Sequence, residues 1–298
     1  ASRVLVGIGF GLVTLRNACI RKMFAGDDKK AAAWLGITNA LVTLTSSIMS
    51  PISGALADIS LKYAYLLYFA AALPFLLNIL FFKEPEDTEE EASAKEEVKA
   101  PRGKLDGRVF VYSATVVLMT LFSFPIFTGM STLITSRGIG EAAVSGTVTS
   151  MYSVGCMIGS LAYPVQNSKF SRFGIALDAL LLAAGFGLIV IAQNAFVAMV
   201  GAFLCGVGFT CQSLSHTKWA GDVSDATTRA FASTLLTTSI SIGSFFSSYW
   251  MMAANKLGSA FAFLPTDAER TYLLATILFA VIAVIMFIRD PRPNKNNK

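Results

Sequence analysis

Long apolar runs are the feature of this sequence that most restricts its possible folds. A helix crosses a bilayer with about 20 apolar residues, and nine segments of the chain are of that kind. Lipid offers no partners to unpaired backbone groups, so such segments must be helices, or alternating strands of about 10 residues in a closed barrel. The runs are longer and continuous. We therefore predict an all-α polytopic bundle with nine transmembrane helices, at residues 4–24, 31–56, 62–82, 109–135, 142–165, 173–192, 195–217, 228–254 and 270–289.

The composition agrees with a membrane protein and excludes several other classes. Only 14% of the residues are charged, against about 25% in soluble domains. The four cysteines lie inside apolar runs without a Cys-x-x-Cys pair, and the chain has one His. We therefore expect neither a metal site nor a cofactor. No basic stretch with interleaved aromatic residues points to nucleic acid.

The segment Lys83 to Arg108 interrupts the apolar pattern, because 15 of its 26 residues are charged. So polar a segment cannot offset its ordering entropy by burying apolar surface, and we interpret it as a solvated linker. The predicted domains are therefore residues 1–82 with three helices, the linker 83–108, residues 109–290 with six helices, and the tail 291–298.

Basic residues distinguish the two sides of the membrane. Twelve lie in one set of connections and five in the opposite set, before those of the linker are counted. Because cytoplasmic loops carry the excess of Lys and Arg, the linker and the C-terminus are predicted to be cytoplasmic and the N-terminus outside. We expect a multi-pass protein of the plasma membrane, namely a bacterial inner membrane.

An internal repeat relates the two sides of the linker. Gly7-Ile8-Gly9-Phe10 aligns with Gly206-Val207-Gly208-Phe209 at an offset of 199 residues. In both places the apolar run leads into a short Gly-Asp loop and then a run rich in Ser and Thr. Internal repeats are typical of transporter folds. If runs 1–3 correspond to runs 7–9, three further helices are expected before residue 1.

At this point the chain resembles the major facilitator superfamily, as helices four to twelve of the family's twelve. Arg3, Gly7, Gly9 and Gly11 match the R-x-x-x-G-x-G-x-G opening of the fourth helix. Residues 46–55, SSIMSPISGA, resemble the fifth-helix motif through Pro51 and Gly54, with Ser or Ala where Gly is usual at three positions. Residues 159–174 resemble a degraded copy of the G-x-L-A-D-R-x-G-R loop, in which Tyr163 replaces the Asp.

The resemblance implies two pseudo-symmetric six-helix halves that rock around a central cavity near the bilayer midplane, with the first half incomplete here. In the family that cavity is lined by helices one, four, seven and ten. The implied cavity helices of this chain are 4–24, 109–135 and 195–217, and the first one is absent.

Arg16 is the charged candidate within an apolar run. A charge at membrane depth costs at least about 2.5–3.5 kcal/mol, so it normally faces a cavity or a partner. Arg16 therefore either binds an anionic group of a substrate, or snorkels to the cytoplasmic surface near Arg21. Asn17 follows it and corresponds to His216 in the repeat.

A second set of candidates lies on the run 195–217. Gln212, Ser215 and His216 are spaced i, i+3, i+4, which predicts one helix face. An ordinary His side chain titrates near physiological pH, so His216 is a candidate for substrate binding or proton coupling. The alternative is a backbone-bonded His at the helix end.

Other polar positions have simpler interpretations. In the run 109–135, Ser123 and Phe127 are candidates for a pocket lining beside a bend at Pro125. Asp178 is interpreted as a structural acid near a helix N-terminus, and Asp58 as a surface cap.

The leading hypothesis is a secondary active transporter that moves a small solute by alternating access, coupled to a proton or an ion. The substrate is either a small organic anion or polar metabolite, or an amphipathic drug-like compound that is exported. The alternatives are a non-transporting sensor or receptor on a transporter fold, and a membrane-embedded enzyme, for which clustered acids, His and Cys are lacking; we expect no enzymatic activity. The protein is expected to be a monomer in the bilayer.

Overall fold

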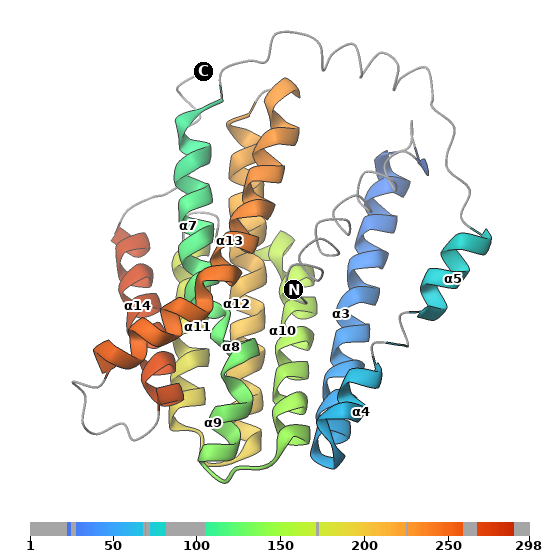
Figure 1. The fold of residues 1–298 in the computed structure, drawn as a ribbon. Helices are drawn as coiled ribbons and strands as arrows, with labels where there is room; N and C mark the ends of the chain where they lie inside the picture. Colours follow the sequence, from blue (N-terminus) through green and yellow to red (C-terminus); the bar gives the residue numbers. More distant parts are fainter. Residues whose placement is uncertain are drawn as a thin grey trace. The chain divides into compact units, whose positions relative to one another are not determined.

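The computed structural model describes residues 23–24, 28–67, 69, 72–81, 105–170, 173–224, 226–258 and 267–288. Within these ranges every regular element is a helix, which confirms the predicted all-α fold (Figure 1). Residues 1–22 and most of the linker lie outside the described residues. The motif residues Arg3, Gly7, Gly9 and Gly11 and the candidates Arg16 and Asn17 lie outside them too.

The chain divides into two compact units. The first holds residues 1–44 and 68–101, and the second holds residues 45–67 and 102–298. Before the linker the helices are α3 (Asp28–Ile59), α4 (Leu61–Leu66) and α5 (Ala72–Phe81). The predicted run 62–82 is therefore not one continuous helix but is interrupted between α4 and α5. The predicted domain boundaries at residues 82 and 109 stay a prediction.

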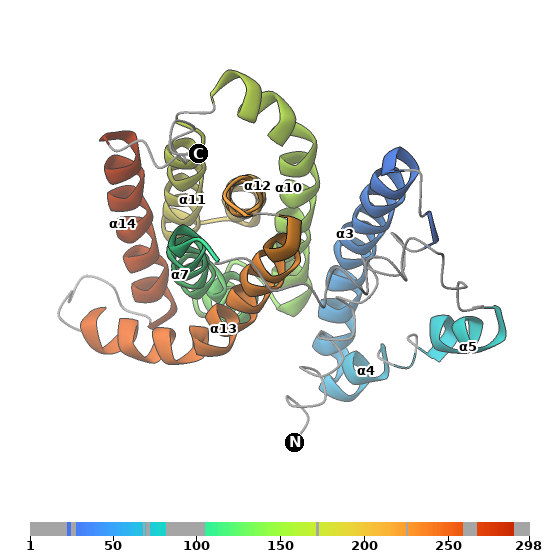
Figure 2. The same ribbon diagram turned by 90° about the horizontal axis from the view of Figure 1, so that it is seen from above.

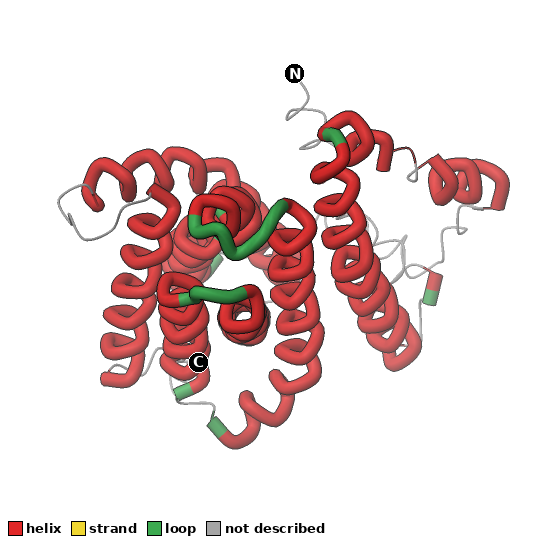
Figure 3. Tube along the Cα trace, turned by 90° about the horizontal axis from the view of Figure 1, so that it is seen from below, coloured by secondary structure: helices red, strands yellow, loops and turns green. Residues whose placement is uncertain are grey.

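The remaining helices follow the predicted runs closely, with ends within five residues of the prediction, and most are joined by short loops (Figure 3). They are α7 (Gly107–Ser123), α8 (Pro125–Thr128), α9 (Met130–Ser136), α10 (Ala142–Lys169), α11 (Gly174–Ile191), α12 (Ala195–Asp222), α13 (Ala226–Gly258) and α14 (Asp267–Ile288).

The predicted bend at Pro125 is present as an interruption. The run 109–135 is divided into α7, α8 and α9, and Pro125 is the first residue of α8. A proline is tolerated at a first helical position because the amide hydrogen it lacks would be unpaired there anyway. The Pro125 carbonyl accepts a hydrogen bond from the buried Tyr272 hydroxyl of α14 at 2.9 Å, which fixes the bend against a neighbouring helix.

Among the described residues, four helical segments are long and apolar enough to cross a membrane by length and composition. They are Gly107–Thr128, Gly174–Ile191, Ala195–Asp222 and Ala268–Ile288. The helices α3, α10 and α13 are also longer than the 20 or so residues that a span needs, at 32, 28 and 33 residues. Of these, α10 and α13 are richer in Ser, Thr and Gly than the four candidate spans. The count of nine spans stays a prediction.

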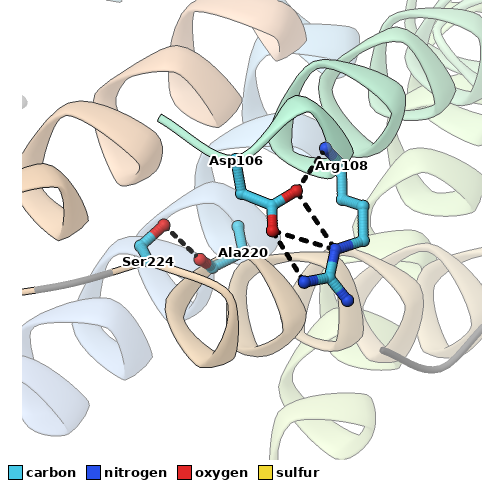
Figure 4. A network of polar contacts seen from close by, with 4 residues as sticks. All are labelled: Asp106, Arg108, Ala220 and Ser224. Carbon is cyan, nitrogen blue, oxygen red and sulfur yellow. Dashed lines mark hydrogen bonds and ion pairs between the residues drawn. The ribbon is translucent and has the colours of Figure 1, made fainter. Parts of the chain in front are cut away.

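The helix α7 begins within the last residues of the predicted linker, with a local cap (Figure 4). The Asp106 carboxylate accepts a hydrogen bond from the Arg108 backbone N–H at 2.8 Å and pairs with the Arg108 guanidinium at 2.6 Å. These bonds stabilise the charged form and lower the pKa of Asp106. Figure 4 also shows Ser224 donating to the Ala220 carbonyl at 2.6 Å, one turn back at the end of α12.

The helix α12 lies at the centre of the second unit. Seen end-on it stands among α7, α10, α11 and α13 (Figure 2), and it contacts each of them. Its tightest contacts are with α10 and α11. The main core cluster lies beside it and includes Phe186 of α11 and Phe279 of α14, whose rings stack with centroids 5.7 Å apart.

Two glycines of the Gly-x-Gly motif let α12 approach two neighbours. A Cβ on Gly206 would lie 2.1 Å from the Tyr152 carbonyl oxygen of α10. A Cβ on Gly208 would lie 2.7 Å from the Asp178 carbonyl oxygen of α11. Both distances are too short for a real side-chain atom. The motif therefore serves close helix packing, as small residues do in membrane bundles.

The SSIMSPISGA segment, which holds the motif residues Pro51 and Gly54, packs on α10 within the second unit. The Ser50 hydroxyl donates to the Gly146 carbonyl at 3.0 Å, and the Ser150 hydroxyl donates to the Ser47 carbonyl at 2.7 Å. Pro51 also lies at this contact, because a Cβ on Gly146 would meet its Cα at 3.0 Å. The segment therefore joins a helix that precedes the linker to one that follows it.

Candidate functional site

Polar side chains gather in the second half of α12. Gln212, Ser215 and His216 are 2%, 6% and 3% exposed. Burying polar groups in an apolar bundle is costly unless they are hydrogen-bonded. The hydrogen-bond partners of these three side chains differ.

A pocket opens beside Gln212 between α7, α12 and α13. It is lined by Val116, Met119, Thr120, Phe209, Gln212, Ser213, His216 and Ile240. Both atoms of the Gln212 side-chain amide lack a hydrogen-bond partner among the described residues. Leaving a buried polar group unpaired costs about 1–3 kcal/mol. An amide held unpaired at the edge of a pocket can recognise a bound group that both donates and accepts.

His216 contributes an oriented ring to the same pocket. Its Nδ1 lies 2.8 Å from the Gln212 backbone carbonyl, which can only accept, so Nδ1 is the donor. In the neutral ring Nε2 is then an acceptor. The ring also contacts Tyr112 edge-on, with centroids 6.3 Å apart, and Trp219 at 5.8 Å. His216 thus makes the backbone hydrogen bond that the alternative interpretation predicted, and it also lines the pocket.

Ser215 belongs to a different pocket, although it adjoins His216 in the sequence. This second pocket lies between α10, α11 and α12 and is lined by Tyr163, Gln166, Asn167, Gly174, Ile175, Ser215 and Trp219. The Ser215 hydroxyl donates to the Cys211 carbonyl of its own helix at 3.0 Å. The structure therefore brings Gln212 and His216 together and places Ser215 apart from them.

Asp178 is fully buried near the second pocket. Its Oδ1 accepts a hydrogen bond from the Gln166 amide at 2.6 Å, and the same nitrogen donates to the Gly174 carbonyl at 3.1 Å. Its Oδ2 has no partner among the described residues. The Gln166 amide thus ties the end of α10 to the start of α11, and this contact agrees with a structural role for Asp178.

The candidates on α7 and α8 line neither pocket. Ser123 is 3% exposed and its hydroxyl has no partner among the described residues. Phe127 is 46% exposed and packs against Tyr152 and Phe124, with ring centroids 4.9 and 5.3 Å away. Arg16 and Asn17 lie outside the described residues, so this geometry does not involve them.

Several lining residues were not singled out from the sequence. Met119 and Thr120 of α7 and Ile240 of α13 look like ordinary members of apolar runs. Thr120 lies three residues before Ser123, and this helical spacing is the one signal that could have indicated it. The others could be found only from the packing of three helices.

Comparison with protein families gives a match. The family model described as the Major Facilitator Superfamily matches residues 1–248, which is most of the chain. No curated protein and no solved structure matches. The matched residues include the SSIMSPISGA segment, the Gly-x-Gly motif of α12 and the pocket that contains Gln212 and His216. The chain therefore belongs to the major facilitator superfamily, a family of multi-pass membrane transporters.

Proposed function

We propose that this protein is a secondary active transporter that carries a small solute across the membrane by alternating access, coupled to a proton or an ion. The single observation that supports it best is the buried, unpaired amide of Gln212 in the pocket between α7, α12 and α13. The linings of ligand sites are largely apolar, with a few polar groups that orient the ligand, and the lining of this pocket has that composition.

The described lining of the pocket supports one substrate class. It contains no Asp, Glu, Lys or Arg, and it combines aliphatic, thioether and aromatic groups with an amide, two hydroxyls and an imidazole. Such a lining suits an amphipathic solute that offers both a hydrogen-bond donor and an acceptor to Gln212. A small organic anion is the second candidate, and it rests on Arg16, outside the described residues.

The pocket also supports a coupling role for His216. Its ring nitrogens are oriented by the Gln212 carbonyl, and its exposed fraction of 3% keeps it apart from bulk water. A His in this position can exchange a proton with a bound solute. The positive-inside count supports a cytoplasmic linker and C-terminus, which would put the loop at residue 141 and the end of α3 on the outer side.

The test is uptake into proteoliposomes with a panel of amphipathic cations, neutral amphiphiles and organic anions. Gln212→Leu preserves volume and removes both amide atoms. We expect at least about a tenfold loss of kcat/KM for the transported solute, because a site built to hydrogen-bond discriminates strongly when the bond is removed. Ser215→Ala is the matched control on the same helix and should retain transport.

Equal losses in the two variants would contradict the assignment of the pocket. Saturable binding of a panel compound without flux in the unmodified protein would instead support a sensor or receptor. Preferential uptake of organic anions, together with unchanged uptake by the Gln212→Leu variant, would favour the second substrate class.

A further inference from the structure

The first turn of α10 is capped by a side chain from a distant part of the chain. The two carboxylate oxygens of Asp58, near the end of α3, accept hydrogen bonds from the backbone N–H groups of Ala142 and Ala143, at 2.8 and 2.9 Å. The residue at the N-cap position of α10 itself, Glu141, makes no side-chain cap bond. Asp58 therefore caps another helix, where the sequence indicated an ordinary surface cap.

Local capping is the pattern at three other helices of this chain. Ser60, Asp106 and Asn194 cap α4, α7 and α12, and each directly precedes the helix it caps. Asp58 precedes Ala142 by 84 residues. Because the charged linker lies between them, the bond joins the predicted N-terminal half to the predicted C-terminal half.

The contact continues inward from the cap as a seam of small residues. A Cβ on Gly54 would lie 2.4 Å from the Ala142 carbonyl oxygen, and one on Gly146 would lie 2.5 Å from the Ser50 carbonyl oxygen. The hydroxyl bonds of Ser50 and Ser150 cross the same seam. Two backbones this close leave no room for side chains between them, so the seam is closed from Asp58 to Ser150.

The bonds of Asp58 differ from those deeper in the seam because Asp58 is exposed. When the contact opens, water can replace both hydrogen bonds at the carboxylate and at the freed N–H groups. The cost of opening at this end is therefore modest, whereas an unsatisfied group at depth would be far more expensive. A contact of that strength suits an equilibrium that must be reversed in every transport cycle.

We propose that Asp58 is a releasable latch that holds the outer ends of the two halves together in the conformation seen here. The inference rests on the proposed function, because alternating access requires the halves to separate at one side at a time. In this conformation the outer side is closed along the seam. Outward opening breaks the two Asp58 bonds first and then parts the small-residue seam.

The expected effect of removing the latch follows from the size of a helix cap. Asp58→Ala removes both acceptors and should shift the closed-to-open ratio toward the open state by about fivefold, the typical worth of a cap. Asp58→Asn keeps one side-chain oxygen and remains a good capping residue, so its shift should be smaller. Glu141→Ala is the matched control, because Glu141 occupies the cap position of the same helix without a side-chain bond.

Hydrogen–deuterium exchange of the full-length protein in lipid nanodiscs tests the latch without any substrate. In Asp58→Ala we expect amides on both sides of the seam, in residues 47–58 and 142–150, to exchange several-fold faster together. Asn194→Ala provides the comparison for simple helix fraying, and it should speed exchange only in the first turn of α12.

Two results would overturn the latch. One is faster exchange confined to residues 142–145, which means that Asp58 only caps its partner helix. The other is an equal effect in Glu141→Ala. If Asp58→Ala does not fold, the same comparison between Asp58→Asn and Glu141→Ala decides the question. The exchange experiment needs no solute, so a result that contradicts the latch leaves the transport proposal standing. If the exchange result supports the latch but no solute is transported, only the transport proposal is rejected.

Discussion

At the scale of single residues, α12 alternates between positions that admit another backbone and positions that carry polar side chains. Gly206 and Gly208 face α10 and α11, and one and two turns later Gln212 and His216 face a pocket. The glycines bring α10 and α11 close to α12, whereas Gln212 and His216 face the pocket that α12 shares with α7 and α13. The helix period thus places each kind of residue. The same substitution can therefore raise stability at one point of the helix and lower it at another.

Alanine at two glycines of α12 should give changes of opposite sign. Gly206→Ala places a Cβ 2.1 Å from the Tyr152 carbonyl oxygen, and we expect a loss of about 1–3 kcal/mol from overpacking. Gly221→Ala meets nothing within 4 Å, and replacing a helical Gly by Ala stabilises by up to about 1 kcal/mol. Thermal melting in detergent measures both. A lower melting temperature for Gly221→Ala than for Gly206→Ala would contradict the packing argument.

At the scale of elements, side chains cap the starts of α4, α7, α10 and α12, and the caps differ in whether the side chain is local. The cap of α7 comes from Asp106 at its own start, whereas the cap of α10 comes from Asp58 on α3. A local cap stabilises one helix. A cap from another helix also joins the two elements, so only a cap of that kind is broken when the two elements separate.

The Asp106 cap of α7 should depend on pH at the acid end only. The hydrogen bonds from Arg108 hold the pKa of Asp106 below its ordinary value of 3.8, so the cap contributes its full stability at neutral pH. That contribution is lost as the pH falls from about the ordinary value through the lower folded-state value. Asp106→Ala should cost about 0.5–2 kcal/mol at pH 7. Asp106→Asn should retain most of the cap and lose this pH dependence, and acid titration of thermal stability measures both.

At the scale of the whole second unit, one ion pair gathers three helix ends on the same side. Arg137, at the end of α9, pairs with Glu269 of α14 at 2.5 Å and donates to the Ala192 carbonyl after α11 at 2.8 Å. Glu269 is 4% exposed as a residue. A charge buried to this degree depends on its partner, so the pair determines how these three ends stay together.

Removing both members of this pair should cost less than the sum of the two single removals. Arg137→Gln should destabilise the protein by about 3 kcal/mol, because it removes the guanidinium that pairs with the buried Glu269 carboxylate. Glu269→Gln should cost less, because the Arg137 side chain is 20% exposed and keeps its bond to the Ala192 carbonyl. The double variant should lose less than the sum of the two, by about 0.5–3 kcal/mol. A double-mutant cycle on thermal stability measures this coupling, and strict additivity would show that the pair does not act as a unit.

The helical form of the apolar runs and the bend at Pro125 were predictable from residue patterns, because lipid leaves the backbone no other choice and proline lacks the amide that a helix interior needs. The repeat singled out Gly206, but its close packing on Tyr152 was not predicted, because the sequence does not show which helix approaches a glycine. The pairing of Asp58 with α10 was not predictable, because the two lie 84 residues apart and no local pattern links them.

The sequence by itself determined the class of fold, the family and the polar residues that α12 carries within its apolar run. The tertiary structure alone decided which of those residues share a site. A helix turns about 100° per residue, so Ser215 and His216 point about 100° apart, with Gln212 between them. Spacing predicts a common face for all three, but the positions of α7 and α13 on one side and α10 and α11 on the other divide that face into two pockets.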